Sequence, residues 1–196
     1  MTTTTALRRN RTDRFADWAV IGLVVVALIA GWLVKSSTEN AMQAASNDVA
    51  AFDYPKGWLV DQSDGLSVQD ARLGSASGVA TTFSVSVEAI DGDPSLNALS
   101  TRRTIKLSQD LDGFSMLGTK PDNLNGEAAV TLSYAYVIVP EAGTAGSARL
   151  PVVVQATDTL VKRNGELYIV HFNSDANSFE SLAALRAKMM SSVKLP

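Results

Sequence analysis

The sequence contains no cysteine and only one histidine, His171. Without cysteine, the chain has no disulfide, no thiolate metal site, no cysteine nucleophile and no lipid-modified cysteine. A single histidine also excludes a histidine-rich metal site. These absences remove common sequence signals of metalloenzymes and thiol enzymes, so we expect neither a metal ion nor a cofactor.

Positive charge is scarce after the first 35 residues. Residues 36–196 hold 12 Lys and Arg against 18 Asp and Glu, whereas residues 1–35 hold 5 against 2. Sequence-independent binding of nucleic acid relies on neutralising phosphates, for which an acidic domain is poorly suited. We therefore expect no nucleic-acid partner.

One long apolar run stands near the N-terminus, WAVIGLVVVALIAGWLV at residues 18–34. As a helix it would span roughly 25 Å, slightly short of a ~30 Å hydrocarbon core. Flanking residues extend the predicted transmembrane helix to residues 15–35. Trp18 and Trp32 lie at its two ends, where indoles prefer the headgroup level, and Leu23, Val25 and Leu28 lie between them.

The charges around this run predict its orientation. Four arginines precede it, Arg8, Arg9, Arg11 and Arg14, and only Lys35 follows closely. The positive-inside rule places residues 1–14 in the cytoplasm and the C-terminal domain outside a cell membrane that the chain crosses once. A cleaved signal peptide is the alternative. The length of the run and its second Trp favour an uncleaved anchor in the lipid bilayer.

The rest of the chain divides into a stalk and a folded domain. Residues 36–49 are polar and alanine-rich and tolerate helix, and the domain is expected over residues 50–196. Alternation predicts strands at residues 66–73 and 81–90. Residues 127–140 are apolar on both faces, which is typical of a central strand.

Turn and cap residues complete the pattern. Asn164-Gly165 suits a type I′ turn and predicts a hairpin of residues 149–163 and 166–173. Residues 121–126 are expected to form a turn. Asp93 and Pro94 predict the start of a helix that ends near Gly113, and Asn177 is expected to cap a final helix with Glu180 as its partner. The sequence therefore predicts an α+β fold, a mostly antiparallel sheet flanked by helices, after a single transmembrane helix.

Four stretches of the domain resemble the PsbP-like family, whose name comes from an extrinsic subunit of photosystem II. They are FDYPKGW at residues 52–58, VTLSYAYVIVP at 130–140, DTLVKRNGELYIVHF at 158–172 and SFESLAALRAKMMSSVKL at 178–195. The resemblance covers most of residues 50–196 and implies an α/β/α sandwich that serves as a scaffold for docking to larger assemblies. The membrane anchor and the single histidine depart from that family, so neither photosystem binding nor a metal role is carried over.

His171 is the first candidate for chemistry. Alternation places it on the same face as Leu167 and Ile169, where a hydrogen-bonded, partly buried imidazole is more typical than a general base. Asp91-Gly92-Asp93 lacks the further ligands of an EF-hand loop. No catalytic, cofactor-binding or metal-binding residue is predicted.

The candidate docking residues lie in two of the three predicted helices. Arg102, Arg103 and Lys106 form a basic cluster, which is either a solvated helix face or a docking patch for an acidic partner. Gly22 and Ala27 would allow close contact with other transmembrane helices.

These features predict a non-enzymatic, membrane-anchored accessory subunit. Its outer domain would dock on and stabilise a larger membrane protein complex, and its partners would be the other subunits. A photosynthetic or respiratory electron-transfer assembly is suggested by analogy of fold. The alternative is a free-standing anchored binding module or enzyme that acts on a lipid or small molecule, with a concave apolar pocket near His171 or the Gly/Ala loops.

Overall fold

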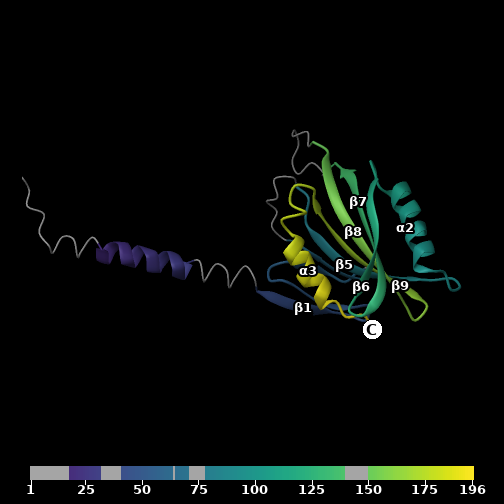
Figure 1. Cartoon of the computed structure of the whole chain (residues 1–196), viewed down its shortest axis with the longest axis horizontal. Helices are drawn as coiled ribbons and strands as arrows, with labels where there is room; N and C mark the ends of the chain where they lie inside the picture. The colour runs from purple at the N-terminus through teal and green to yellow at the C-terminus, as the bar shows by residue number, and fades with distance from the viewer. Residues whose placement is uncertain (1–17, 32–40, 64, 71–77, 140–149) are drawn as a thin grey trace, which may run out of the picture. The chain divides into compact units, whose positions relative to one another are not determined.

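The computed structural model describes residues 18–31, 41–63, 65–70, 78–139 and 150–196. The chain divides into two units, Met1–Ala41 and Met42–Pro196. The second unit is the folded domain, and a seven-stranded sheet forms its centre (Figure 1).

In the first unit, residues 18–31 are helical and exposed. This helix carries six of the predicted anchor and contact residues, namely Trp18, Gly22, Leu23, Val25, Ala27 and Leu28, whereas Trp32 falls outside the described residues. Within the described ranges, no helix has both the length and the apolar character needed to cross a membrane. The transmembrane helix predicted over residues 15–35 is therefore not confirmed.

The main sheet has the strand order β3-β4-β5-β9-β8-β7-β6, and every pairing in it is antiparallel. The strands are β3 Leu59–Asp61, β4 Leu66–Gln69, β5 Thr82–Ala89, β6 Ser115–Leu124, β7 Glu127–Ile138, β8 Val152–Arg163 and β9 Glu166–Asp175. The predicted antiparallel sheet is confirmed, including an interior position for β7.

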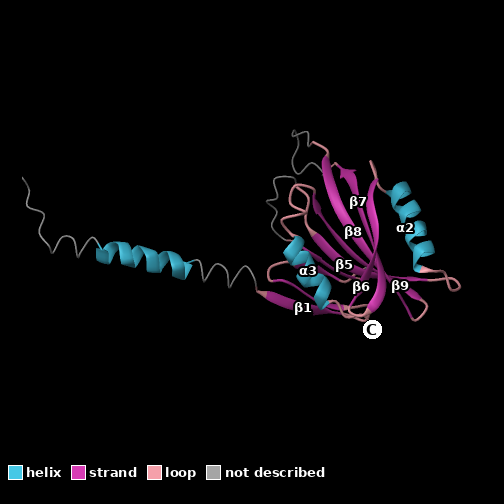
Figure 2. Ribbon diagram, in the orientation of Figure 1, coloured by secondary structure: helices cyan, strands magenta, loops and turns pink. Residues whose placement is uncertain are grey.

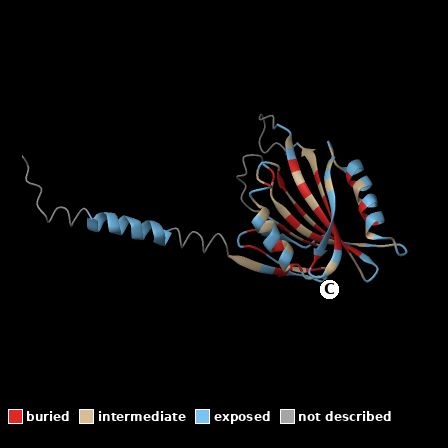
Figure 3. Ribbon diagram, viewed as in Figure 1, coloured by how far each residue is buried: buried red, intermediate tan, exposed pale blue. Residues whose placement is uncertain are grey.

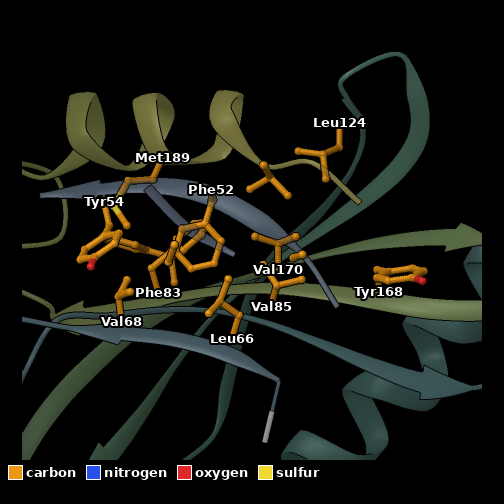
Figure 4. Packing of buried hydrophobic residues seen from close by; sticks show 14 of the residues in the cluster. Phe52, Tyr54, Leu66, Val68, Phe83, Val85, Leu124, Tyr168, Val170 and Met189 are labelled. Carbon is orange, nitrogen blue, oxygen red and sulfur yellow. The ribbon is translucent and has the colours of Figure 1, made fainter. Parts of the chain in front are cut away.

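Helices cover the two faces of this sheet (Figure 2). Helix α2 (Leu96–Asp110) packs on one face, while α3 (Ala183–Ser192) and the small sheet of β1 (Met42–Ser46) and β2 (Ala51–Pro55) lie on the other. Because side chains alternate along a strand, Val170 and Phe172 of β9 join the α3-side core, and Ile169 joins the α2-side core. Buried residues therefore run along the middle of the sheet (Figure 3), and Figure 4 shows the α3-side core closely.

Two tight turns fix the register of the long hairpins. Asn164 and Gly165 have φ values of 52° and 80°, which confirms the predicted turn between β8 and β9. Asn125 and Gly126, with φ values of 53° and 97°, join β6 to β7 in the same way. Strand β6 therefore continues to Leu124, and the predicted turn at residues 121–126 starts too early. Pro121 is tolerated because β6 is an edge strand, where a missing N–H costs no ladder bond.

Both helices of the folded unit, α2 and α3, begin later than predicted. Ser95, not Asp93, caps α2, because its side chain accepts a hydrogen bond from the Ala98 N–H at 3.2 Å. Asp93 instead pairs with Lys162. Helix α3 starts after Leu182 without a side-chain cap, and turns precede it.

The folded unit also starts before residue 50. Residues 42–46, predicted as part of the stalk, form β1 and pair with β2 over Met42↔Pro55 to Ser46↔Ala51. Ala45 is buried against the α3-side core. Packing on that core overrides the helical propensity of this alanine-rich stretch.

Candidate functional site

Arg103 points from α2 into the protein. Its Nε donates a hydrogen bond to Oδ2 of Asp158 at 2.7 Å. The Arg103 side chain is 17% exposed and the Asp158 side chain is 0% exposed. This arginine was predicted to lie on a solvated or docking face, and the structure instead makes it the internal partner of a buried carboxylate.

Asp158 has two further partners on neighbouring strands. Nδ1 of His171 lies 2.7 Å from Asp158 Oδ1, and the Tyr134 hydroxyl donates to the same oxygen at 3.0 Å. The register pairs Asp158 with His171 across β8 and β9. On β7, Tyr134 lies two positions after Leu132, the residue that faces Asp158, and therefore on the same side of the sheet. We call Arg103, Tyr134, Asp158 and His171 the polar cluster.

The electrostatics of the polar cluster favour an ionised Asp158. Burial alone would raise the pKa of Asp158, but the hydrogen bonds and positive charges of His171 and Arg103 outweigh burial and hold this pKa below its usual value. Burial, together with the negative charge of Asp158, raises the pKa of Tyr134 far above its usual value. At neutral pH the Tyr134 hydroxyl is therefore protonated and donates to an ionised Asp158 carboxylate.

The polar cluster is largely shielded from solvent. Asp158 is out of reach of solvent, and the His171 side chain is only 22% exposed. A nucleophile activated by His171 would need a hydroxyl within hydrogen-bond reach. Among the described residues, Tyr134 is the only one whose hydroxyl is hydrogen-bonded to His171, at 3.5 Å, and its raised pKa makes it a poor nucleophile.

The outer face of α2 remains exposed. Arg102 and Lys106 are exposed, and Ile105 between them is 53% exposed. Lys106 lies 3.4 Å from the Glu88 carboxylate of β5 at the margin of this face. We call Arg102, Ile105 and Lys106 the α2 outer face.

The fold has clear relatives among solved structures, although no known family model matches the sequence and no curated protein matches it. The solution structure of cyanobacterial PsbP (CyanoP) from Synechocystis sp. PCC 6803 has a TM-score of 0.55 and 17% identity and covers 80% of this chain and 93% of its own. The folded unit has a PsbP-like fold.

Two further solved structures share this fold. LpqN, involved in cell envelope biogenesis of Mycobacterium tuberculosis, matches with a TM-score of 0.54 and 13% identity over 80% of this chain and 93% of LpqN. The Ran-binding protein Mog1p of Saccharomyces cerevisiae matches with a TM-score of 0.50 and 12% identity over 79% and 96%. At such identities the likeness concerns the fold alone.

The PsbP-like domain separates the residues that the sequence grouped together. Of the predicted basic cluster, only Arg102 and Lys106 share an exposed face, because successive helical residues point about 100° apart and Arg103 falls on the sheet side. The residues Gly22 and Ala27 lie in the helix of residues 18–31, outside this domain. Asp91 and Asp93 belong to no group of three or more potential metal ligands in the described part of the chain.

Sequence reasoning correctly gave His171 a hydrogen bond but missed its partner. Asp158 stands in β8 between Thr157 and Thr159, where its alternation with Ala156 and Leu160 points it to the core. A charged residue at an inward position is a signal for a buried pair, because an unpaired buried charge is costly. The cation that pairs with Asp158 is Arg103, which lies 55 positions away in the sequence and so gives no local signal.

Proposed function

We propose that this chain is a membrane-anchored, non-catalytic accessory subunit whose PsbP-like domain docks on a larger membrane protein complex through the α2 outer face. The main observation behind this proposal is that one of the three predicted basic residues is internal and the other two are exposed. Arg103 fixes α2 to the sheet through the buried Asp158, while Arg102, Ile105 and Lys106 remain exposed. A rigid helix that presents cations and an apolar side chain suits an acidic protein surface.

The net charge of the domain makes the cations of the α2 outer face distinctive. Residues 36–196 carry more acidic than basic side chains, so a pair of outward cations is a local exception. Complementary charge of this kind chiefly sets the orientation and the association rate of a complex. The partner should therefore present carboxylates to α2.

The fold relatives support an interaction role by analogy. One of them is named as a Ran-binding protein and another is involved in cell envelope biogenesis. A shared fold does not transfer a partner. It does make an adaptor built on this scaffold a reasonable expectation, and a photosynthetic or respiratory assembly is one setting for it.

The sequence supports the membrane anchor. The apolar run of residues 18–34 has a Trp near each end and four arginines before it, so the PsbP-like domain would lie on the extracytoplasmic side. A tether raises the effective concentration of the domain at the membrane surface. A modest docking face is then sufficient for stable association.

The alternative function is a free-standing binding module or enzyme, for which His171 would be the working group. Its half-buried imidazole next to Asp158 is the observation that favours this alternative. However, two pockets of about 520 Å³ lie on the α3 side of the domain, and neither is lined by His171.

The test is gentle detergent extraction of the native membrane, size separation and mass spectrometry of the proteins that co-migrate with this chain. We expect co-migration with a multi-subunit complex for the wild type and its loss for Arg102→Glu/Lys106→Glu. The matched control is Lys188→Glu, which reverses an exposed charge on α3 and should preserve co-migration. Migration of the wild-type chain alone, or equal co-migration of the wild type and both variants, would overturn the proposed docking.

A further inference from the structure

A groove lies on the other face of the sheet from the α2 outer face. Its volume is about 520 Å³, within the range of small-molecule sites. One wall comes from α3 and the turn before it, and the floor comes from β6, β7 and β8. Helix α3 itself packs on the core that contains Phe83 and Phe172 (Figure 4), so the edge half of the sheet is left as an open floor.

The floor of the groove is polar, although other positions on the same face of the sheet carry apolar residues. On this face, Ala129 of β7 and Val161 of β8 lie opposite each other and belong to the α3-side core. The next positions carry hydroxyl and amide groups, namely Thr131, Ser133, Gln155, Thr157 and Thr159. Thr131 is hydrogen-bonded to Thr159 at 2.9 Å and donates to Asp122 at 2.7 Å. Because Thr131 and Thr159 are buried and bonded to each other, the polar side chains that remain for a ligand in the groove are Ser133, Gln155 and Thr157.

The wall of the groove carries a guanidinium group with an unused donor. The Cζ atom of Arg186 lies 4.2 Å from the ring centroid of Phe179 and 5.6 Å from that of Phe172. Its Nη1 atom is buried and has no hydrogen-bond partner among the described residues. Burial lowers the pKa of Arg186, against the opposing charge of Glu180. A buried donor without a partner is destabilising, and the planar fork of arginine is suited to carboxylates.

The charges that line the groove limit the ligand. Lys120 and Arg186 are balanced by Asp122 and Glu180. A ligand with two negative charges would be repelled by the carboxylates of Asp122 and Glu180. A ligand with one negative charge can be neutralised by the guanidinium of Arg186 alone. The hydroxyl and amide floor suits a ligand with hydroxyl groups of its own.

We infer that this groove binds a small monoanionic carboxylate that also carries hydroxyl groups. Arg186 pairs with the carboxylate, and the side chains of Ser133, Gln155 and Thr157 hydrogen-bond the rest of the ligand. The site is independent of the proposed docking, because the α2 outer face and the groove lie on opposite faces of the sheet.

The neighbouring pocket does not offer the same chemistry. It also measures about 520 Å³ and shares Leu124, Asn125 and Ser191 with the groove. Its arginine, Arg163, already lies 3.0 Å from Glu127 and donates to the Leu195 carbonyl at 3.3 Å. The unused donor is therefore specific to the Arg186 groove.

The test is an NMR titration of the full ¹⁵N-labelled chain in detergent micelles with sodium gluconate, a hydroxylated monoanionic carboxylate. Sodium chloride at equal ionic strength and inorganic phosphate are the comparison titrants. We expect saturable shifts of the Arg186 Nε–H signal and of the Thr157 and Thr159 amides with gluconate only. Arg186→Gln should weaken the apparent affinity at least tenfold, and the matched control Arg102→Gln on α2 should leave it unchanged.

Three results would overturn the inference. They are an equal response to chloride, tighter binding of phosphate than of gluconate, and unchanged gluconate binding by Arg186→Gln. If Arg186→Gln does not fold, Thr157→Val keeps the shape of the floor and removes a hydroxyl, so unchanged affinity in that variant would also count against the site.

Discussion

Arg103 on α2 and Asp158 on β8 form a 2.7 Å ion pair across 55 positions of sequence, and the carboxylate is completely buried. This contact joins the helix to the middle of the sheet, where apolar side chains such as Leu99 and Leu107 supply the rest of the packing. The direction of α2, and hence the direction of its outer face, depends on a polar contact as well as on hydrophobic burial.

The first prediction concerns this pair. Arg103→Gln leaves Asp158 buried with fewer partners, and we expect it to lower the free energy of unfolding by about 3 kcal/mol, the lower end of the range for breaking a buried ion pair. The lower end applies because His171 and Tyr134 still contact the carboxylate. Urea denaturation measures the change. The neighbouring Arg102→Gln should stay within about 0.5 kcal/mol of the wild type, as exposed substitutions usually do. Equal effects of the two variants would contradict an internal role for Arg103.

The second prediction is a pH dependence that comes from Asp158. Since the pKa of Asp158 is lowered in the folded protein, its stabilising contribution is complete above the unfolded carboxyl pKa of about 4. That contribution is lost as the pH falls through the lowered pKa. The free energy of unfolding of the wild type should therefore decrease between about pH 5 and pH 2.

Asp158→Asn provides the comparison for this effect. The variant is less stable at neutral pH, and its stability should depend less steeply on acid because one carboxylate with a lowered pKa is gone. Urea titrations at a series of pH values give both curves. Parallel curves for the wild type and Asp158→Asn would show that Asp158 titrates alike in the folded and unfolded states, contrary to the polar cluster described above.

The third prediction separates the structural and catalytic roles of His171. His171→Ala removes one partner of a buried carboxylate, so we expect a loss of about 1–3 kcal/mol in the free energy of unfolding. Co-migration with the native complex should persist at temperatures where the variant remains folded. A folded His171→Ala chain that keeps its partners but loses a measurable activity would favour the enzyme alternative.

Local signals in the sequence were sufficient for much of the fold. Asn164-Gly165 predicted the β8–β9 hairpin because the positive φ values of a type I′ turn select those residue types. Alternation predicted a strand at residues 81–90, and the structure has β5 there with Phe83 and Val85 in the α3-side core. Strand β1 was missed because its alanines become a strand only through pairing with β2, and the continuation of β6 through Pro121 depends on its place at the edge.

The candidate site was less accessible from sequence. His171 was singled out, but Asp158 and Arg103 meet only after α2 packs on β8, and pattern alone does not give such a long-range contact. Arg186 lies among the apolar positions of α3, where its role depends on two rings and an open groove from distant segments. Periodicity predicts the face of an element but not the element it meets.

The last prediction compares two glycines with similar backbone conformations. Gly65 and Gly57 have φ values of +88° and +95°, which disfavour any side chain at either position. A Cβ at Gly65 would lie 2.4 Å from the Val85 carbonyl oxygen, whereas a Cβ at Gly57 meets nothing within 4 Å. Gly57→Ala should therefore show the conformational cost alone, about 1–2 kcal/mol. Gly65→Ala should cost about 1–3 kcal/mol more, because β5 or the turn must shift to relieve the overlap. Urea denaturation of the two variants measures the difference, and equal losses would mean that the turn at Gly65 moves away from β5 freely.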